Sequence, residues 1–99
     1  MLLIERLELD KKYNVREDVV FTDLDDGSSV LLHLETKYYF SLNETGTFLW
    51  RLLDKEDGTT GENMAKDLCE AYDVAPDRAR QDVSEFLTNL NEQGLIIKG

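Results

Sequence analysis

The side chains that most often perform catalysis, histidine and cysteine, occur once each in this 99-residue sequence. His33 lies among leucines in a stretch that alternates like a β-strand, where a solvent-facing or hydrogen-bonded histidine is more common than a catalytic one. Cys69 lies in a run of apolar residues at helical spacing, which favours a buried structural thiol. Neither residue has a neighbouring base or nucleophile, so the pattern predicts no nucleophile–base pair.

Paired carboxylates are the second arrangement that could do chemistry, and the sequence offers Asp25 with Asp26 and Glu56 with Asp57. Both pairs stand in polar stretches, where nothing would desolvate a carboxyl group and raise its pKa. None of the six glycines forms a phosphate-binding loop, and a single cysteine suggests neither an internal disulfide nor a metal site. The sequence therefore predicts no catalytic residue, metal or cofactor, which leaves binding or delivery as the leading class of function.

The charge of the chain disfavours two common classes of partner. It carries 21 acidic and 11 basic residues, for a net charge of −10, and the acidic residues are spread along its length. Such a surface repels phosphate groups, so nucleic acid and anionic membranes are not expected partners. The opening stretch MLLIERLELD contains Glu5 and Glu8, which make it too charged, as well as too short, for a signal peptide or a membrane span. We expect a cytoplasmic protein.

The length of the chain and its 41% share of apolar residues predict one globular domain. Its first half has the pattern of a small sheet. The predicted strands are residues 18–24, 29–35 and 38–42. Turn residues separate the first strand from the second, and a short loop separates the second from the third. We therefore expect an antiparallel three-stranded meander. In the third strand Tyr38, Phe40 and Leu42 share one face. Tyr39 and Ser41 lie on the other.

The second half changes to helical spacing at Asn43, a residue type that favours the N-cap position. The apolar pattern predicts a first helix over Glu44–Leu53. A second helix begins after Thr59 or Thr60, and Thr59 has Glu62 at the capping-box spacing. Its apolar stripe is Met64, Ala65, Leu68, Cys69 and Tyr72.

A third helix is expected to begin near Pro76, which suits a first helical turn, and to end near Gly94, which suits a C-cap. Residues 95–98 are apolar, and we expect them to pack back as an extended segment. Strands followed by helices imply an α+β fold with the helices on one face of the sheet. The domain is expected to span residues 16–99, while residues 1–15 could form an extra strand, a loose arm or a dimerisation element.

Three stretches of the chain form a recognisable series: YYFSLNETGTFLWRLLD (38–54), TTGENMAKDLCEAYDV (59–74) and DVSEFLTNLNEQGLI (82–96). In this order they resemble the PqqD family, the small proteins of coenzyme PQQ biosynthesis and the related elements that recognise precursors of ribosomally made, modified peptides (RiPPs). The resemblance covers residues 16–97. The chain departs from the family pattern at Asn63, where a glutamate is frequent, and at Ala75, a poor helix cap. Both departures concern helix boundaries.

The resemblance implies a winged helix-turn-helix-like domain, with a three-stranded antiparallel sheet followed by a three-helix bundle. It also implies a non-catalytic function. In that family the domain holds the leader part of a precursor peptide and presents the core part to a modifying enzyme, often a radical SAM protein. The leader binds as an added strand along strand three, in a groove whose other wall is helix three. Carried onto this chain, the binding strand is Tyr38–Leu42 and the groove helix is Asp77–Leu90.

Elementary physics supports such a site, because an edge strand offers unpaired N–H and C=O groups to an added peptide. Aromatic side chains near that edge would supply contact area, and one side of helix three would supply the opposite wall. The predicted peptide-binding residues are Tyr38, Tyr39, Phe40, Ser41, Leu42, Arg80, Val83, Ser84 and Leu87.

Several of these side chains have a second interpretation, because one face of the sheet must cover the helices. Under it Tyr38, Phe40 and Leu42 are mostly core residues, and the backbone of the strand with Tyr39 does the binding. Val83 and Leu87 would likewise be core, which leaves Arg80 and Ser84 for the groove.

Two rival functions remain open. The first is a winged-helix DNA-binding regulator, but the basic residues of its recognition helix, Arg78 and Arg80, face Asp77, Asp82 and Glu85, which disfavours it. The second is a structural homodimer that uses the same exposed edge.

Overall fold

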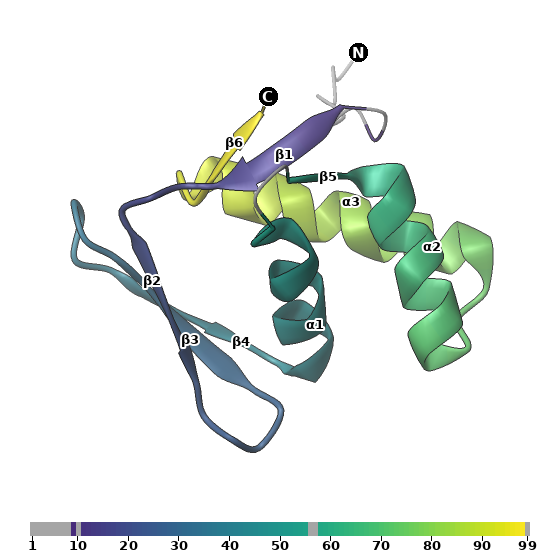
Figure 1. Ribbon diagram of the computed structural model, residues 1–99, viewed down its shortest axis with the longest axis horizontal. Coiled ribbons are helices and arrows are strands. Elements are labelled where there is room, and N and C mark those ends of the chain that lie inside the picture. Colours follow the sequence, from purple (N-terminus) through teal and green to yellow (C-terminus); the bar gives the residue numbers. More distant parts are fainter. Residues whose placement is uncertain (1–8, 10, 56–57, 99) are drawn as a thin grey trace, which may run out of the picture.

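The computed structural model describes residues 9, 11–55 and 58–98. Its elements are strands β1 (Lys12–Val15), β2 (Val19–Asp23), β3 (Ser29–His33) and β4 (Tyr39–Leu42), helix α1 (Glu44–Leu53), strand β5 (Thr59–Thr60), helices α2 (Gly61–Tyr72) and α3 (Pro76–Glu92), and strand β6 (Ile96–Lys98). Figure 1 shows their arrangement, with one sheet standing beside the three helices. The pair Glu56 and Asp57 and the charged start of the chain, residues 1–8, lie outside the described residues.

Strands β2, β3 and β4 form the predicted antiparallel meander, with β3 in the centre. Leu31 of β3 lies opposite Phe21 on one side and Phe40 on the other. This inner face is joined to α1, because the hydroxyl groups of Ser29 and Thr47 are 2.7 Å apart and both residues are buried. All three helices lie on the inner side of the meander (Figure 1). The expected α+β fold is confirmed.

A second sheet, in the order β5-β1-β6, was not predicted as a sheet, although its strand β1 is the extra strand offered as one possibility for residues 1–15. Strand β1 pairs antiparallel with both of its neighbours, and Tyr13 of β1 is wholly buried in the common core. The expected order of three strands and then three helices is therefore too simple, since β5 lies between α1 and α2. Strands of two to four residues are too short to show an alternating pattern, and their partners are remote in the chain. The extended segment expected at residues 95–98 is confirmed as β6.

The starts of α1 and α2 follow the local sequence. Asn43 caps α1 as predicted, and its Oδ1 accepts a hydrogen bond from the N–H of Gly46 at 2.8 Å. At α2 the capping residue is Thr60, whose hydroxyl accepts from the N–H of Asn63 at 3.1 Å. The capping box proposed from Thr59 is therefore wrong, because Thr59 lies one residue too early in strand β5.

Helix α3 starts abruptly and ends in a well-formed C-cap. It begins at Pro76 with no side-chain hydrogen bond from the preceding Ala75. At its end Gly94 adopts a φ of +69°, and the N–H of Leu95 donates to the C=O of Leu90 at 2.9 Å. This is the Schellman arrangement, in which glycine takes the left-handed position that other residues adopt at a cost.

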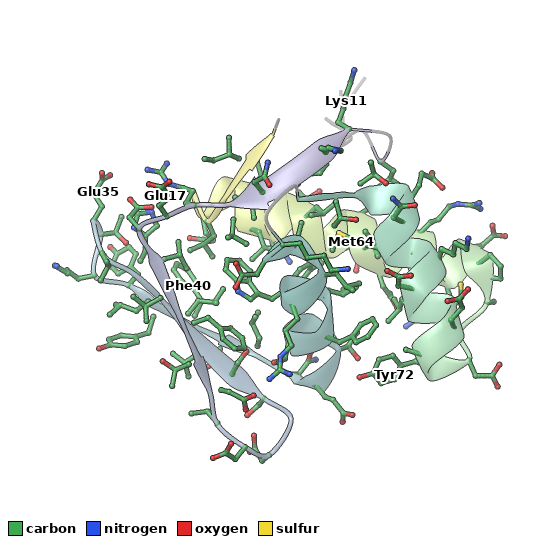
Figure 2. All side chains as sticks on the ribbon, in the orientation of Figure 1. Lys11, Glu17, Glu35, Phe40, Met64 and Tyr72 are labelled. Atoms are coloured by element: carbon green, nitrogen blue, oxygen red, sulfur yellow. The ribbon has the colours of Figure 1, made fainter. Side chains whose placement is uncertain are left out.

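One core joins both sheets to the helices. Its largest fully buried side chains are Trp50, Tyr13, Leu31, Leu49, Leu53, Met64, Leu68 and Leu87. The stripe predicted for α2 packs against the core as far as Cys69, which is half-buried there, whereas Tyr72 at its end is 38% exposed. The Tyr72 ring packs edge-on against Phe48 of α1, with 5.2 Å between the ring centres (Figure 2).

Candidate peptide-binding site

Strand β4 is one of the two outer strands of the meander, and the pairing pattern shows which of its groups face outward. The N–H of His33 donates to the C=O of Tyr38 at 3.0 Å, so the C=O of Tyr38 turns toward β3. Antiparallel pairing alternates, so Phe40 and Leu42 also turn inward, whereas the N–H and C=O groups of Tyr39 and Ser41 turn away from β3. Among the described residues no strand pairs with this side of β4. Two donors and two acceptors therefore line an open sheet edge.

The side chains of β4 divide between the two faces of the sheet. Phe40 and Leu42 are half-buried on the inner face, where both pack against the core (Figure 2). Tyr39 is 71% exposed on the outer face, and Ser41 is exposed beside it. Tyr38, which shares the inner face by alternation, is 66% exposed because it stands at the end of the sheet. The core interpretation therefore applies to Phe40 and Leu42, and not to Tyr38.

The loop before β4 is fixed by His33, which is 3% exposed. Its Nδ1 atom accepts hydrogen bonds from the N–H groups of Glu35 and Thr36, at 3.2 and 3.4 Å. The N–H of Tyr38 donates to the Thr36 hydroxyl at 3.3 Å, and Lys37 between them adopts a left-handed φ of +69°. The expectation of a hydrogen-bonded histidine is confirmed. Its role in the structure is to hold the turn that delivers the chain to β4.

The corner after β4 is equally constrained. Leu42 and Asn43 lie so close to Gly46 that a Cβ there would meet both side chains at 3.3–3.4 Å, tighter than most contacts. The buried hydroxyl pair of Ser29 and Thr47 then ties the central strand to the first turn of α1. Close packing at the corner therefore fixes the end of β4 relative to α1, and the hydroxyl pair fixes α1 relative to β3.

Two of the predicted groove residues on α3 belong to the core. Val83 and Leu87 are 0% exposed, as is Ala79 on the same stripe of the helix. Their full burial contradicts a ligand-facing role and supports the core interpretation, because this face of α3 packs into the common core beside α2.

The remaining two predicted helix residues lie on the flank of α3 that faces the start of α2. Arg80 lies within 3.6 Å of the carboxylates of Glu62 and Asp77, and Ser84, one turn later, is on the same flank. Phe86 stands three residues after Val83, and Arg80 three residues before it. Since each residue turns the helix by about 100°, the two side chains point roughly 60° to opposite sides of Val83. Phe86 is half-buried against the core, like Phe40 and Leu42. Phe86 is not among the predicted peptide-binding residues, and an aromatic at the margin of the apolar face stays partly accessible.

The arginines of α3 are engaged by acidic side chains, which weighs against the DNA-binding alternative. Arg78 Nε lies 3.1 Å from Asp82 Oδ1, one turn further along the helix. Arg80 is held between Glu62 and Asp77. Exposed ion pairs of this kind are weak, but with a net charge of −10 they leave no basic surface on this helix for phosphate groups.

Carboxylates stabilise the two ends of the meander. The hydrogen bond from Arg16 is the main reason that the pKa of Asp18 lies below its ordinary value, and the C=O of Asp18 accepts from Leu34 at 2.8 Å. At the opposite end the hydroxyl and N–H of Ser28 lower the pKa of Asp26. Both carboxylates hold turns in place, and neither has the raised pKa of a catalytic acid.

The described residues offer little for other kinds of site. No group of three or more metal-ligating side chains occurs there. Within residues 9, 11–55 and 58–98, no helix has the length and apolar character needed to cross a membrane.

Comparison with known families decides the relationship of the chain. A model of the family described as coenzyme PQQ synthesis protein D (PqqD) matches residues 28–96, which include β3, β4 and all three helices. The chain belongs to the PqqD family. The resemblance drawn from the three sequence stretches is thereby confirmed, including the stretch that contains the open strand and its corner. No curated protein matches the chain in sequence.

Solved structures of similar fold include two complexes with leader peptides. One is TbiB1 in complex with the TbiA(beta) leader peptide, which is 32% identical over 84% of this chain and 93% of that one, with a TM-score of 0.75. Another is a lasso peptide synthetase B1 complexed with its leader peptide, 26% identical over 87% of this chain and 98% of that one, with a TM-score of 0.74.

A third structure agrees in fold. It is the solution structure of the PqqD truncation of Methylobacterium extorquens PqqCD, described as a functional, stand-alone RiPP recognition element. It is 20% identical, covers 91% of this chain and 93% of that one, and has a TM-score of 0.72. The predicted PqqD-like fold, a three-stranded antiparallel sheet with three helices, is confirmed.

Proposed function

We propose that this PqqD-family protein binds the leader of a ribosomal precursor peptide as an added strand on β4 and presents it to a modifying enzyme. The observation that carries the proposal is the open edge of β4, where Tyr39 and Ser41 turn their main-chain groups away from the sheet. Two structures of the same fold, at 32% and 26% identity, are complexes with leader peptides.

The open edge alone is not sufficient for useful affinity. Four main-chain hydrogen bonds contribute roughly 2–6 kcal/mol at about 0.5–1.5 kcal/mol each, while micromolar binding needs about −8 kcal/mol after ordering costs. Burying roughly 200 Å² of apolar surface would add about 5 kcal/mol at ~25 cal/mol per Å². The leader must therefore also bury apolar side chains beside the strand.

The half-buried side chains of the domain suggest where that burial occurs. Phe40 and Leu42 of β4 and Phe86 of α3 all contact one core while keeping part of their surface exposed. We assign the second wall of the groove to the Phe86 flank of α3, in place of the Arg80 flank that the sequence suggested. Arg80 and its acidic partners then lie outside the groove.

The partner and the cellular location that we propose follow from the role of a leader-binding adaptor. Its partner is the enzyme that modifies the core of the precursor, and the class we propose is a radical SAM protein. The adaptor itself needs no catalytic residue and no cofactor, and it works in the cytoplasm, where the precursor is made.

A titration of the isotope-labelled protein with a synthetic leader peptide from a candidate precursor tests the binding site. We expect the outward amides of Tyr39 and Ser41 to shift most, with further shifts on the Phe86 flank of α3. Largest shifts on β2 or β6 would place the site elsewhere.

A pair of variants on α3 then separates its two flanks. Phe86→Ala is expected to weaken leader binding about fivefold or more, because it removes apolar contact area. Arg80→Ala, on the opposite flank, should leave leader affinity within twofold. If Arg80→Ala were the damaging change, the assignment of the groove wall would be reversed.

A further inference from the structure

The outer face of the meander is unusually apolar for a sheet surface that no helix covers. Alternation along a half-exposed antiparallel sheet normally places polar residues outward. Here Val20 and Leu34 are each 42% exposed and Tyr39 is 71% exposed, and on the central strand Leu32 and Val30 are half-buried, with Val30 in the neighbouring row between Thr22 and Ser41. We refer to these five residues as the outer apolar face.

The register makes the outer apolar face continuous across all three strands. Val20 lies directly opposite Leu32, and Leu32 directly opposite Tyr39, so the three side chains form one row. Leu34 continues the face along β3, with its N–H bonded to the C=O of Asp18 on β2. The three helices all lie on the other side of the sheet, so within the described residues no helix covers this row (Figure 1).

We propose that the outer apolar face is the surface on which the peptide-modifying enzyme docks, an inference that rests on the function proposed above. The face adjoins the peptide edge through a single residue. Tyr39 turns its main-chain groups to the open edge and its side chain to the outer apolar face. An enzyme seated there lies next to a leader strand added to β4, which is where the core peptide must be delivered.

Charge around the face indicates the chemistry of the partner. The loops at its two ends and the segment before β2 expose Asp25, Asp26, Glu17 and Glu35, while the cations beside them are Lys37 and Arg16, and Arg16 is paired with Asp18. Glu17 and Glu35 both lie at the end of the sheet away from the 25–28 turn (Figure 2). The matching surface on the enzyme is therefore apolar in its centre with lysine or arginine at its margin.

The same features disfavour a second copy of this chain as the occupant. Pairing two outer faces would bring together two acidic margins on chains that each carry a net charge of −10. Three strands about 4.8 Å apart with four residues of about 3.3 Å each give a face of roughly 200 Å². A standard interface buries roughly 800 Å² per partner, so the flat face alone is too small for a stable dimer. An enzyme can add contacts to the loops and to the bound leader.

The test uses the full chain with a candidate precursor peptide and the enzyme that modifies it, with affinities measured by calorimetry. The double variant Val20→Thr with Leu34→Gln removes apolar surface while keeping a β-branched residue in the strand and a similar length in the loop. Its matched control is Ile97→Thr on β6, a residue that is 51% exposed on the other sheet. Trp50 fluorescence verifies that each variant is folded.

We expect the double variant to bind the enzyme at least tenfold more weakly and the leader within twofold of the wild type. The control should change neither affinity. Raising the salt concentration should weaken enzyme binding several-fold, because the margin pairs acidic with basic groups.

Three outcomes would overturn the docking surface. These are unchanged enzyme affinity in the double variant, a wild-type protein that binds leader but not enzyme, and a wild-type dimer that the double variant dissociates with no loss of enzyme affinity. A wild-type protein that fails to bind the leader, or that binds the leader but no enzyme, would count against the proposed function as well, whereas the other two outcomes overturn the docking surface alone.

Discussion

The two edges of the meander differ in how they are protected. Strands β2 and β4 flank the same central strand, and each turns the main-chain groups of alternate residues outward. At the β2 edge, Arg51 of α1 forms an ion pair with Asp23, and its guanidinium lies 5.7 Å from the centre of the Phe21 ring. The β4 strand, with the sequence YFSL, contains no charged residue and no proline.

This difference separates an edge that the protein protects from one that it leaves available. Open edges promote unwanted pairing, and natural sheets protect them with charges, prolines, bulges or a covering segment. Strand β2 has a charged residue at its end and the Arg16–Asp18 ion pair just before its start. Strand β4 has neither, although its position within the sheet is equivalent. The absence of protection on one edge alone is what we expect if that edge binds a peptide.

The largest effect on stability is expected from removing the hydrogen bonds of the loop that precedes β4. His33→Phe keeps an aromatic ring but removes the acceptor for the N–H groups of Glu35 and Thr36. The free energy of unfolding should fall by about 1–3 kcal/mol. Urea denaturation monitored by the fluorescence of Trp50, the single tryptophan, measures it.

Hydrogen exchange shows whether the loss is confined to one edge. In His33→Phe the inward amides of Phe40 and Leu42 on β4 should exchange faster by a larger factor than those of Val20 and Thr22 on β2. An equal acceleration on both strands would mean that the loop supports the whole sheet and does not distinguish its edges.

A proline on the open edge tests peptide binding directly. Ser41→Pro removes an outward N–H while leaving the hydrogen bonds between β3 and β4 intact, as proline does on edge strands. The loss of one hydrogen bond, at about 0.5–1.5 kcal/mol, should weaken leader binding about three- to tenfold. The matched control is Val19→Pro, which removes an outward N–H from the β2 edge and should leave leader affinity unchanged. Equal losses in both variants would contradict the distinction between the edges.

Removing the protection of β2 is expected to have a smaller effect. Arg51→Met retains a long apolar side chain but loses the ion pair with Asp23 and the cation–π contact with Phe21. The free energy of unfolding should fall by about 0.5–1 kcal/mol, because both contacts are near the surface. Sedimentation should reveal weak self-association through the β2 edge at high concentration, and leader affinity should stay the same. A loss of leader binding would show that the two edges are coupled.

The smallest effect on stability is expected when low pH protonates Asp18, just before the start of β2. The pKa of Asp18 is lowered, chiefly by its hydrogen bond with Arg16, so its contribution to stability is present above the ordinary carboxyl pKa. That contribution is lost as the pH falls through the lowered value. Asp18→Asn should therefore show a slightly shallower loss of stability between about pH 5 and pH 3 than the wild type. An identical pH profile would mean that the ion pair contributes nothing measurable.

Local signals in the sequence predicted the elements that hold the candidate site. The meander, the cap at Asn43, the end of α3 at Gly94 and the family relationship all come from neighbouring residues whose chemistry acts within a few positions. The side chains of α3 were assigned less well. Val83 and Leu87 proved to be core and Phe86 was overlooked, because helical spacing identifies an apolar stripe without showing what packs on each margin.

By itself the sequence determined that the protein is an acidic α+β domain whose YFSL strand runs into a capped helix, since alternation, turn chemistry and capping are local effects. Only the tertiary structure decided which β4 groups are open, which flank of α3 stays accessible, and that β1, β5 and β6 form a second sheet. These depend on register and on contacts between residues remote in the chain. Such contacts are set by packing the whole core, and no short stretch of sequence encodes them.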